Sequence, residues 1–152
     1  MEHGTDLAAA IESAVGSLVA VLESASLAQT PAIPPTQLRV LTIIAAGGTT
    51  NMNRLAETLK VVPSSASRLC DRLEATGLLH RAADPRDRRE VQLLLTAAAR
   101  QLLDELQARR REALGAVLDR MPVSQRQELL RSLTAFSLAA GTPAGAADRR
   151  SA

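Results

Sequence analysis

Eight arginine and lysine residues lie between positions 54 and 89, where they could neutralise the phosphates of a nucleic acid. The same stretch carries five carboxylates, so its formal charge is +3, whereas the rest of the chain carries −1. Three of the cations, Arg86, Arg88 and Arg89, fall within four residues. A local excess of positive charge attracts phosphate because neutralisation releases condensed counterions. A solvated surface would show the same excess, so charge alone does not separate the two interpretations.

A second group of polar residues follows Pro63, which suits the first position of a helix because its missing N–H would have no partner there. We expect this helix over residues 63–76, closed by Gly77. One face is apolar, with Ala66, Leu69, Cys70 and Leu73, and the opposite face carries Ser64, Ser67, Arg68 and Asp71. An arginine on such a face can bind guanine O6 and N7, with ~1–3 kcal/mol of discrimination between bases. The competing interpretation of Arg68 is a weak surface ion pair with Asp71.

The elements around these residues form a recognisable supersecondary unit. Thr50 or Asn51 can cap a short helix that ends before a three-residue turn, Lys60-Val61-Val62. Two helices joined by such a turn are typical of a helix-turn-helix. Residues 78–82 and 90–95 are strand candidates on either side of a charged loop at 83–89. A helix-turn-helix followed by a hairpin with a basic tip predicts a winged helix.

Helices are also expected on both flanks. Thr5 can cap a helix reaching about Ala28, whose apolar stripe is suited to packing along another helix; its members are Leu7, Ile11, Val15, Leu18, Leu22 and Ala25. After the prolines at 31, 34 and 35, Thr36 can cap the next helix, which Gly47-Gly48 ends. Thr96 and Ser124 can cap two further helices, the first reaching about Arg120 and the second carrying Leu129, Leu130, Leu133 and Phe136. Residues 141–152 are expected to form a flexible tail.

Length and composition exclude several classes of protein. A chain of 152 residues suits one domain. One Phe and neither Trp nor Tyr leave no aromatic platform for stacked single-stranded bases. One cysteine permits neither an internal disulfide nor a multi-cysteine zinc site. The acidic N-terminus is unlike a signal peptide, and no uninterrupted apolar run approaches ~18 residues. We therefore expect a cytoplasmic protein that does not engage a membrane.

The residues give no support for an enzyme. No glycine-rich phosphate loop, nucleophile elbow or paired-histidine zinc motif is present, and no histidine lies near a candidate nucleophile. His80 stands alone on a strand, and Cys70 is expected to be a buried apolar residue rather than a sensor. No cofactor or metal is expected.

Four segments together resemble the MarR family of bacterial winged-helix transcriptional regulators: residues 55–69, 71–78, 84–89 and 93–96. The most specific is Asp84-Pro85-Arg86-Asp87-Arg88-Arg89, followed by Leu95-Thr96. The resemblance implies a homodimer clasped by residues 5–30 and 97–140, with a DNA-binding lobe over 36–95 and a wing over 78–95. It also implies a repressor that binds a pseudo-palindromic duplex operator, and control by a small-molecule effector.

The resemblance and the residue chemistry together give a set of expected contacts with duplex DNA. The start of the recognition helix favours a phosphate, its polar face meets the major groove, and Arg72 meets backbone phosphate. By resemblance, Arg89 enters the minor groove and Asp87 organises it through a local pair. The expected DNA-binding residues are Pro63, Ser64, Ser65, Ser67, Arg68, Arg72, Arg86, Asp87, Arg88 and Arg89.

Two positions depart from the family pattern, because Lys60 and Val62 stand where glycine and a capping serine are usual. The alternative function is a winged-helix module for protein interaction without sequence-specific DNA binding. Residues 109–111, all arginine, fit either a surface cluster or pairing across a dimer, and the sequence does not decide between them.

Overall fold

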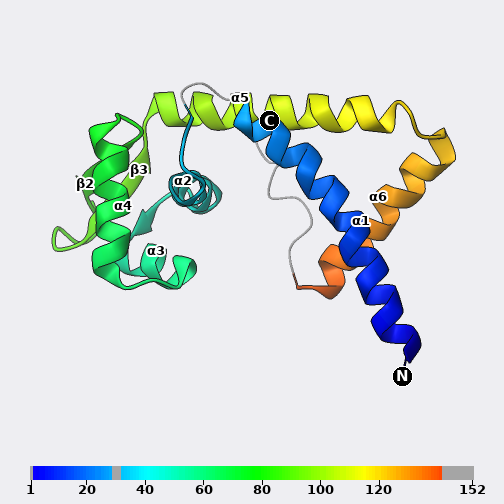
Figure 1. The fold of residues 1–152 in the computed structure, drawn as a ribbon. Coiled ribbons are helices and arrows are strands. Elements are labelled where there is room, and N and C mark those ends of the chain that lie inside the picture. The colour runs from blue at the N-terminus through cyan, green and yellow to red at the C-terminus, as the bar shows by residue number, and fades with distance from the viewer. Residues whose placement is uncertain (1, 29–31, 142–152) are drawn as a thin grey trace. The chain divides into compact units, whose positions relative to one another are not determined.

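The structure is a computed structural model that describes residues 2–28 and 32–141, with side chains from residue 6 onward (Figure 1). It confirms the predicted class: six helices and one small antiparallel sheet form a winged helix with additional helices. The chain divides into two compact units, residues 1–110 and 111–152. The tail predicted beyond Gly141 lies outside the described residues.

The first unit begins with two helices whose starts differ from the prediction. Helix α1 spans Glu2–Leu27, so it begins three residues before Thr5. Helix α2 spans Pro35–Gly47, with Pro34 at the N-cap and no capping side chain. The prediction that Thr36 caps α2 is therefore wrong. The fixed φ of proline suits the first helical turn, so Pro35 can begin the helix without a side-chain cap.

The helix-turn-helix is present where it was predicted. Helix α3 spans Met52–Leu59 and helix α4 spans Pro63–Ala75. Of the two candidate caps for α3, Asn51 is the one used: its Oδ1 accepts the backbone N–H of Arg54 at 2.9 Å. That bond satisfies one of the amides that a helix start leaves without an intrahelical partner.

The wing is a hairpin of β2 (Leu79–Ala83) and β3 (Val91–Leu95), within one residue of the predicted strands. A third strand was not predicted: β1 (Thr50–Asn51) pairs antiparallel with β3, which gives the order β1-β3-β2. Two residues are too few to show the alternation by which a strand is recognised. Through this pairing the start of α3 is joined to the middle of β3.

The core of the first unit collects apolar residues from nearly every element around the sheet. Its largest fully buried side chains are Leu41, Ile44, Leu55, Leu73, Leu79, Leu93, Val40 and Cys70. The predicted apolar face of α4 is confirmed, since Ala66, Cys70 and Leu73 are buried. Helix α4 is therefore held by its inner face, and its outer face stays in solvent.

Helix α5 spans Ala97–Leu118, and its predicted cap is confirmed by the hydrogen bond from the N–H of Ala99 to Thr96 Oγ1 (3.2 Å). Helix α6 spans Val123–Ala139 and begins after Pro122 without a side-chain cap, so the prediction for Ser124 is wrong. The turn before α6 is fixed instead by Arg126, which donates to the carbonyl of Met121 at 2.9 Å.

Two of the three consecutive arginines fasten the end of α1 to α5 within one chain. Arg109 donates to the carbonyl oxygen of Ala28 at 2.8 Å, and Arg110 donates twice to Ser26 Oγ, at 3.0 and 3.3 Å. A cation at a helix C-terminus is favoured because it meets carbonyls without an intrahelical partner and the negative end of the helix dipole. The structure thus gives Arg109 and Arg110 an intrachain role that neither sequence interpretation included.

Helix α1 also has a distinctive length and composition. Between Asp6 and Leu27 it is long and apolar enough, at a mean hydropathy of 1.5, to cross a membrane. No uninterrupted apolar run of that length is present, as expected, because Glu12 and Glu23 lie among the small and apolar residues after Asp6. The expectation that the protein does not engage a membrane stays a prediction. A helix that packs along another helix has the same length and composition, so one such segment is weak grounds for a membrane span.

Candidate nucleic-acid interface

The turn between α3 and α4 accommodates both departures from the family pattern. Lys60 adopts the left-handed conformation, with φ 56° and ψ 43°, and it is the only non-glycine residue with positive φ in the described chain. Its N–H donates to the carbonyl of Glu57 at 3.1 Å, so it closes α3 in the way that a glycine usually does. Val62 is the N-cap of α4 and offers no side-chain acceptor.

The start of α4 presents fewer amide donors than its sequence suggested. Pro63 has no N–H, and the N–H of Ser65 donates to the carbonyl of Val62 at 3.0 Å. The N–H of Ser64 remains as the amide available at this end. The hydroxyl groups beside it supply further donors, because the side chain of Ser64 is exposed and that of Ser65 is half-buried.

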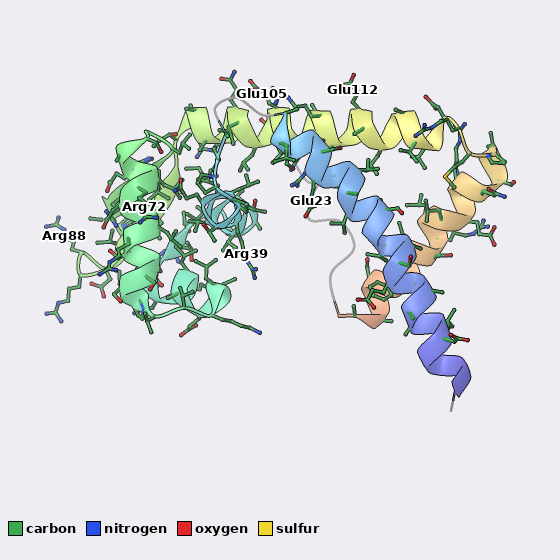
Figure 2. All side chains as sticks on the ribbon, in the orientation of Figure 1. Glu23, Arg39, Arg72, Arg88, Glu105 and Glu112 are labelled. Atoms are coloured by element: carbon green, nitrogen blue, oxygen red, sulfur yellow. The ribbon has the colours of Figure 1, made fainter. Side chains whose placement is uncertain are left out.

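The outer face of α4 carries the polar residues that the helical spacing predicted. Arg68, Asp71 and Arg72 are exposed and Ser67 is half-buried (Figure 2 labels Arg72). The ion pair between Arg68 and Asp71 that competed with DNA contact is not formed. Asp71 instead accepts from Arg81 of β2 at 2.7 Å, and no ion pair of Arg68 or Arg72 is found within the described part of the chain.

Arg81 is a residue of this surface that the sequence analysis did not single out. Its guanidinium also donates to Glu74 at 2.6 Å, so one side chain of the wing binds two carboxylates of α4. The hydrogen bond with Asp71 is the main reason that the pKa of Arg81 is raised above its ordinary value. The pairing of Arg81 with these carboxylates is visible only in the fold, where β2 lies beside α4. No sequence spacing or motif connects position 81 with positions 71 and 74.

The wing loop is shaped by two aspartates that bind backbone amides. Asp84 Oδ1 accepts the N–H of Arg86 at 2.8 Å, and its Oδ2 accepts the side-chain amide of Gln92 at 2.9 Å. These hydrogen bonds, the one from Arg86 first, lower the pKa of Asp84 below its ordinary value. Asp87 Oδ1 accepts the N–H of Arg89 at 3.0 Å. Asp87 therefore holds the backbone of Arg89 and leaves the guanidinium group free of this carboxylate.

The three wing arginines are exposed, and Figure 2 shows Arg88 extending away from the hairpin. Across residues 6–28 and 32–141, none of their guanidinium groups takes part in an ion pair. Asp84 and Asp87 accept hydrogen bonds from amide groups and form no ion pair with the guanidinium groups of the wing. The tip is an ordered loop with three cations available to an external anion.

One further contact ties this loop to the helix-turn-helix. The side-chain amide of Asn51 donates to Glu90 at the end of the wing loop, at 3.4 Å, while its oxygen caps α3. Asn51 was predicted only as a cap. The long-range half of its role follows from the pairing of β1 with β3, which the sequence did not reveal.

No group of three or more His, Cys, Asp or Glu side chains is close enough to hold a metal ion within the described residues. Cys70 is fully buried, as predicted, and this burial raises the pKa of its thiol to about 11. A surface hollow of about 370 Å³ lies between the end of α2 and the start of α3, lined by Ile43, Ala46, Gly47, Thr49, Thr50, Arg54 and Thr58.

Comparison with known proteins agrees with this architecture. The sequence profile described as "MarR family" matches residues 33–90, which include the helix-turn-helix and most of the wing. The HTH-type transcriptional repressor MdtR of Bacillus subtilis is 36% identical over 64 residues. That match covers 42% of this chain and 41% of MdtR, less than half of either protein.

Solved structures extend the similarity over nearly the whole chain. The crystal structure of RV1404 from Mycobacterium tuberculosis superposes with a TM-score of 0.80 at 32% identity, covering 90% of this chain and 93% of that one. A MarR family protein from Bacillus stearothermophilus gives a TM-score of 0.78 with 93% and 97% coverage, but at 18% identity that likeness concerns the fold alone. The matched profile, the winged helix and the 32% identical structure lead to one assignment: the chain belongs to the MarR family of transcriptional regulators.

Proposed function

We propose that this protein is a cytoplasmic transcriptional repressor that binds a pseudo-palindromic duplex operator as a homodimer. The observation that carries the proposal is the wing tip, where Arg86, Arg88 and Arg89 stand on an ordered loop with no ion pair among the described residues. A loop ordered before binding loses less conformational entropy when DNA arrives. Arginine at such a tip suits the minor groove, where a narrow groove deepens the negative potential.

The outer face of α4 supports contact with the major groove. Ser64, Ser67 and Arg68 lie on the side of the helix away from the core, and the Arg68 guanidinium is not held by Asp71. Pro63 and Ser65 place the first turn so that the Ser64 N–H can donate to a phosphate. We assign Arg72 to a backbone phosphate, a contact that positions the helix but does not read sequence.

Exposed apolar side chains support the homodimer. On α1, Leu7, Ile11 and Val15 are 62%, 47% and 43% exposed, and on α6 Phe136 is 67% exposed. Burying such surface is favourable by ~25 cal/mol per Å², so helices of this kind are stabilised by a partner. Sedimentation should give twice the mass of one chain, and Leu7→Glu with Ile11→Glu should shift the protein toward monomer.

Control by a small-molecule effector is also part of the proposal. The hollow beside Arg54 is one candidate position, and Arg54 is the only charged residue among its lining. A screen of small carboxylates and phenols for a rise in unfolding temperature, followed by release of bound DNA, would test it. Loss of the response in Arg54→Ala would place the effector in this hollow.

The DNA immediately upstream of the protein's own gene is the first operator to test. Labelled duplex should bind in preference to a scrambled duplex, and affinity for both should fall as salt rises because phosphate contacts release counterions. The label belongs on the DNA, since the protein has neither Trp nor Tyr. If both duplexes bind weakly and equally, selection from a random duplex library separates a different operator from a protein-interaction module.

A further inference from the structure

Arg81 links the wing to α4 through two ion pairs. It stands on β2 two residues after buried Leu79, so both side chains leave the strand on the side of the core. Its two terminal nitrogens lie 2.7 Å from Asp71 Oδ1 and 2.6 Å from Glu74 Oε2. The carboxylates are three residues apart on one helical face, a spacing that the guanidinium fork can span.

These pairs decide which arginine Asp71 binds. Asp71 follows Arg68 by three residues, a spacing at which opposite charges on a helix attract each other. The Arg81 side chain is only 27% exposed, whereas that of Asp71 is 60% exposed. Asp71 therefore pairs with Arg81, which is the more buried of the two residues and binds Glu74 as well. Arg68 forms no ion pair in the described structure.

Arg81 also changes the charge that α4 presents. Arg68 and Arg72 together balance Asp71 and Glu74, so the helix surface alone would be neutral. With Arg81 in contact with both carboxylates, the surface carries one net positive charge. Without it, two carboxylates would face solvent beside the arginines, and they would repel any phosphate that approached.

We propose that Arg81 is a positioning residue for DNA binding, which keeps Arg68 available to the DNA by holding Asp71 and neutralising it together with Glu74. The inference rests on the proposed function and adds to it a residue that touches no DNA. Arg81 acts through the carboxylates of α4, so its loss should be corrected by removing those carboxylates. If Arg81 contacted phosphate directly, the dependence of log affinity on log salt would stay lower by about one even after the carboxylates are removed.

The test compares operator affinity of the wild type, Arg81→Met, and Arg81→Met combined with Asp71→Asn and Glu74→Gln. Arg81→Met removes the charge and keeps an unbranched apolar side chain. It should bind about threefold to tenfold more weakly, through repulsion and the competing pair with Arg68. The deficit should narrow between about 50 and 200 mM salt, because screening weakens repulsion between exposed charges. The triple variant should bind at least as tightly as the wild type, because Arg68 and Arg72 then stand on the helix with no carboxylate beside them.

A control variant and folding measurements distinguish a positioning role of Arg81 from a general loss of charge and from a loss of folding. Arg120→Met removes the same charge from the turn after α5 and should bind like the wild type. Circular dichroism and denaturant unfolding establish that each variant is folded. If Arg81→Met does not fold, Asp71→Asn alone decides the matter, because it should bind at least as tightly as the wild type and a loss of affinity would contradict the inference.

Two results would overturn the inference and leave the proposed function standing: operator binding by Arg81→Met equal to that of the wild type, or no recovery in the folded triple variant. If the wild-type protein shows no preference for any duplex sequence, even after selection from a library, that result contradicts both the proposed function and the inference. That outcome is visible before any variant is made.

Discussion

The carboxylate of Asp87 accepts a hydrogen bond from the backbone N–H of Arg89, with 3.0 Å between oxygen and nitrogen. The same loop repeats the pattern at Asp84 and Arg86. Both aspartates of the wing motif therefore act on the backbone, and the arginine side chains stay free of them. This arrangement explains why a loop with alternating charges can be both ordered and basic toward an external ligand.

Removing the acceptor at position 87 should loosen the wing tip. In Asp87→Ala the N–H of Arg89 loses its partner, and its hydrogen exchange should accelerate by about fivefold, because one hydrogen bond is worth roughly 1 kcal/mol. Asp87→Asn keeps a side-chain oxygen and should exchange like the wild type. NMR exchange rates measure both variants. Equal acceleration in the two would show that the charge, not the hydrogen bond, orders the loop.

Replacing Lys60 by glycine should stabilise the protein. Lys60 holds φ at 56°, a conformation that costs residues with a Cβ about 1–2 kcal/mol and glycine much less. Part of the gain is offset by the greater freedom of glycine in the unfolded chain, so we expect an increase of ~0.5–1 kcal/mol in the free energy of unfolding. Urea denaturation measures it. Lys60→Ala keeps the Cβ, and a gain of the same size there would contradict a conformational cause.

Val62→Ser should supply the cap that α4 lacks. Position 62 has extended backbone (φ −69°, ψ 148°), which is the conformation of an N-cap. A serine oxygen there could accept from the free N–H of Ser64, and we expect ~0.5–1 kcal/mol of added stability. The Val62 side chain is 62% exposed, so little apolar burial is lost. Val62→Ala is the matched control and should give no increase.

The thiol of Cys70 should stay unreactive in the native protein. Burial raises its pKa from 9.0 to about 11, so the folded state binds its proton more tightly than the unfolded state does. Stability linked to this group is therefore fully present below pH 9 and is lost as pH rises toward 11. A thiol reagent at pH 8 should label only denatured protein. Rapid native labelling, or an alkaline loss of stability identical in Cys70→Ala, would argue against the burial account.

Much of the winged helix could be predicted because its signals are local. The turn at 60–62, Pro63 at the start of α4 and the apolar face around Cys70 each follow from neighbouring residues, and the structure has all three. The structure also confirms the Thr96 cap for the same reason. The predictions of side-chain caps were wrong at the starts of α2 and α6, where a proline stands at the N-cap.

The features that the sequence could not reveal depend on contacts between distant residues. Strand β1 exists because Thr50 and Asn51 pair with β3, about forty positions away. Arg81 meets Asp71 and Glu74 only because β2 lies beside α4. Arg110 reaches Ser26 across 84 positions. Charge and spacing identify candidate groups in such cases, but the tertiary structure selects their partners.

Binding of upstream duplex DNA by Arg89→Ala, compared with the wild type and with Arg120→Ala, tests the central claim most directly. We predict that Arg89→Ala lowers affinity by at least about tenfold and reduces the dependence of log affinity on log salt by about one. Arg120→Ala, which removes the same charge from the turn after α5, should bind like the wild type. Equal affinity of all three proteins for a duplex that the wild type binds selectively would contradict the assignment of the wing to DNA.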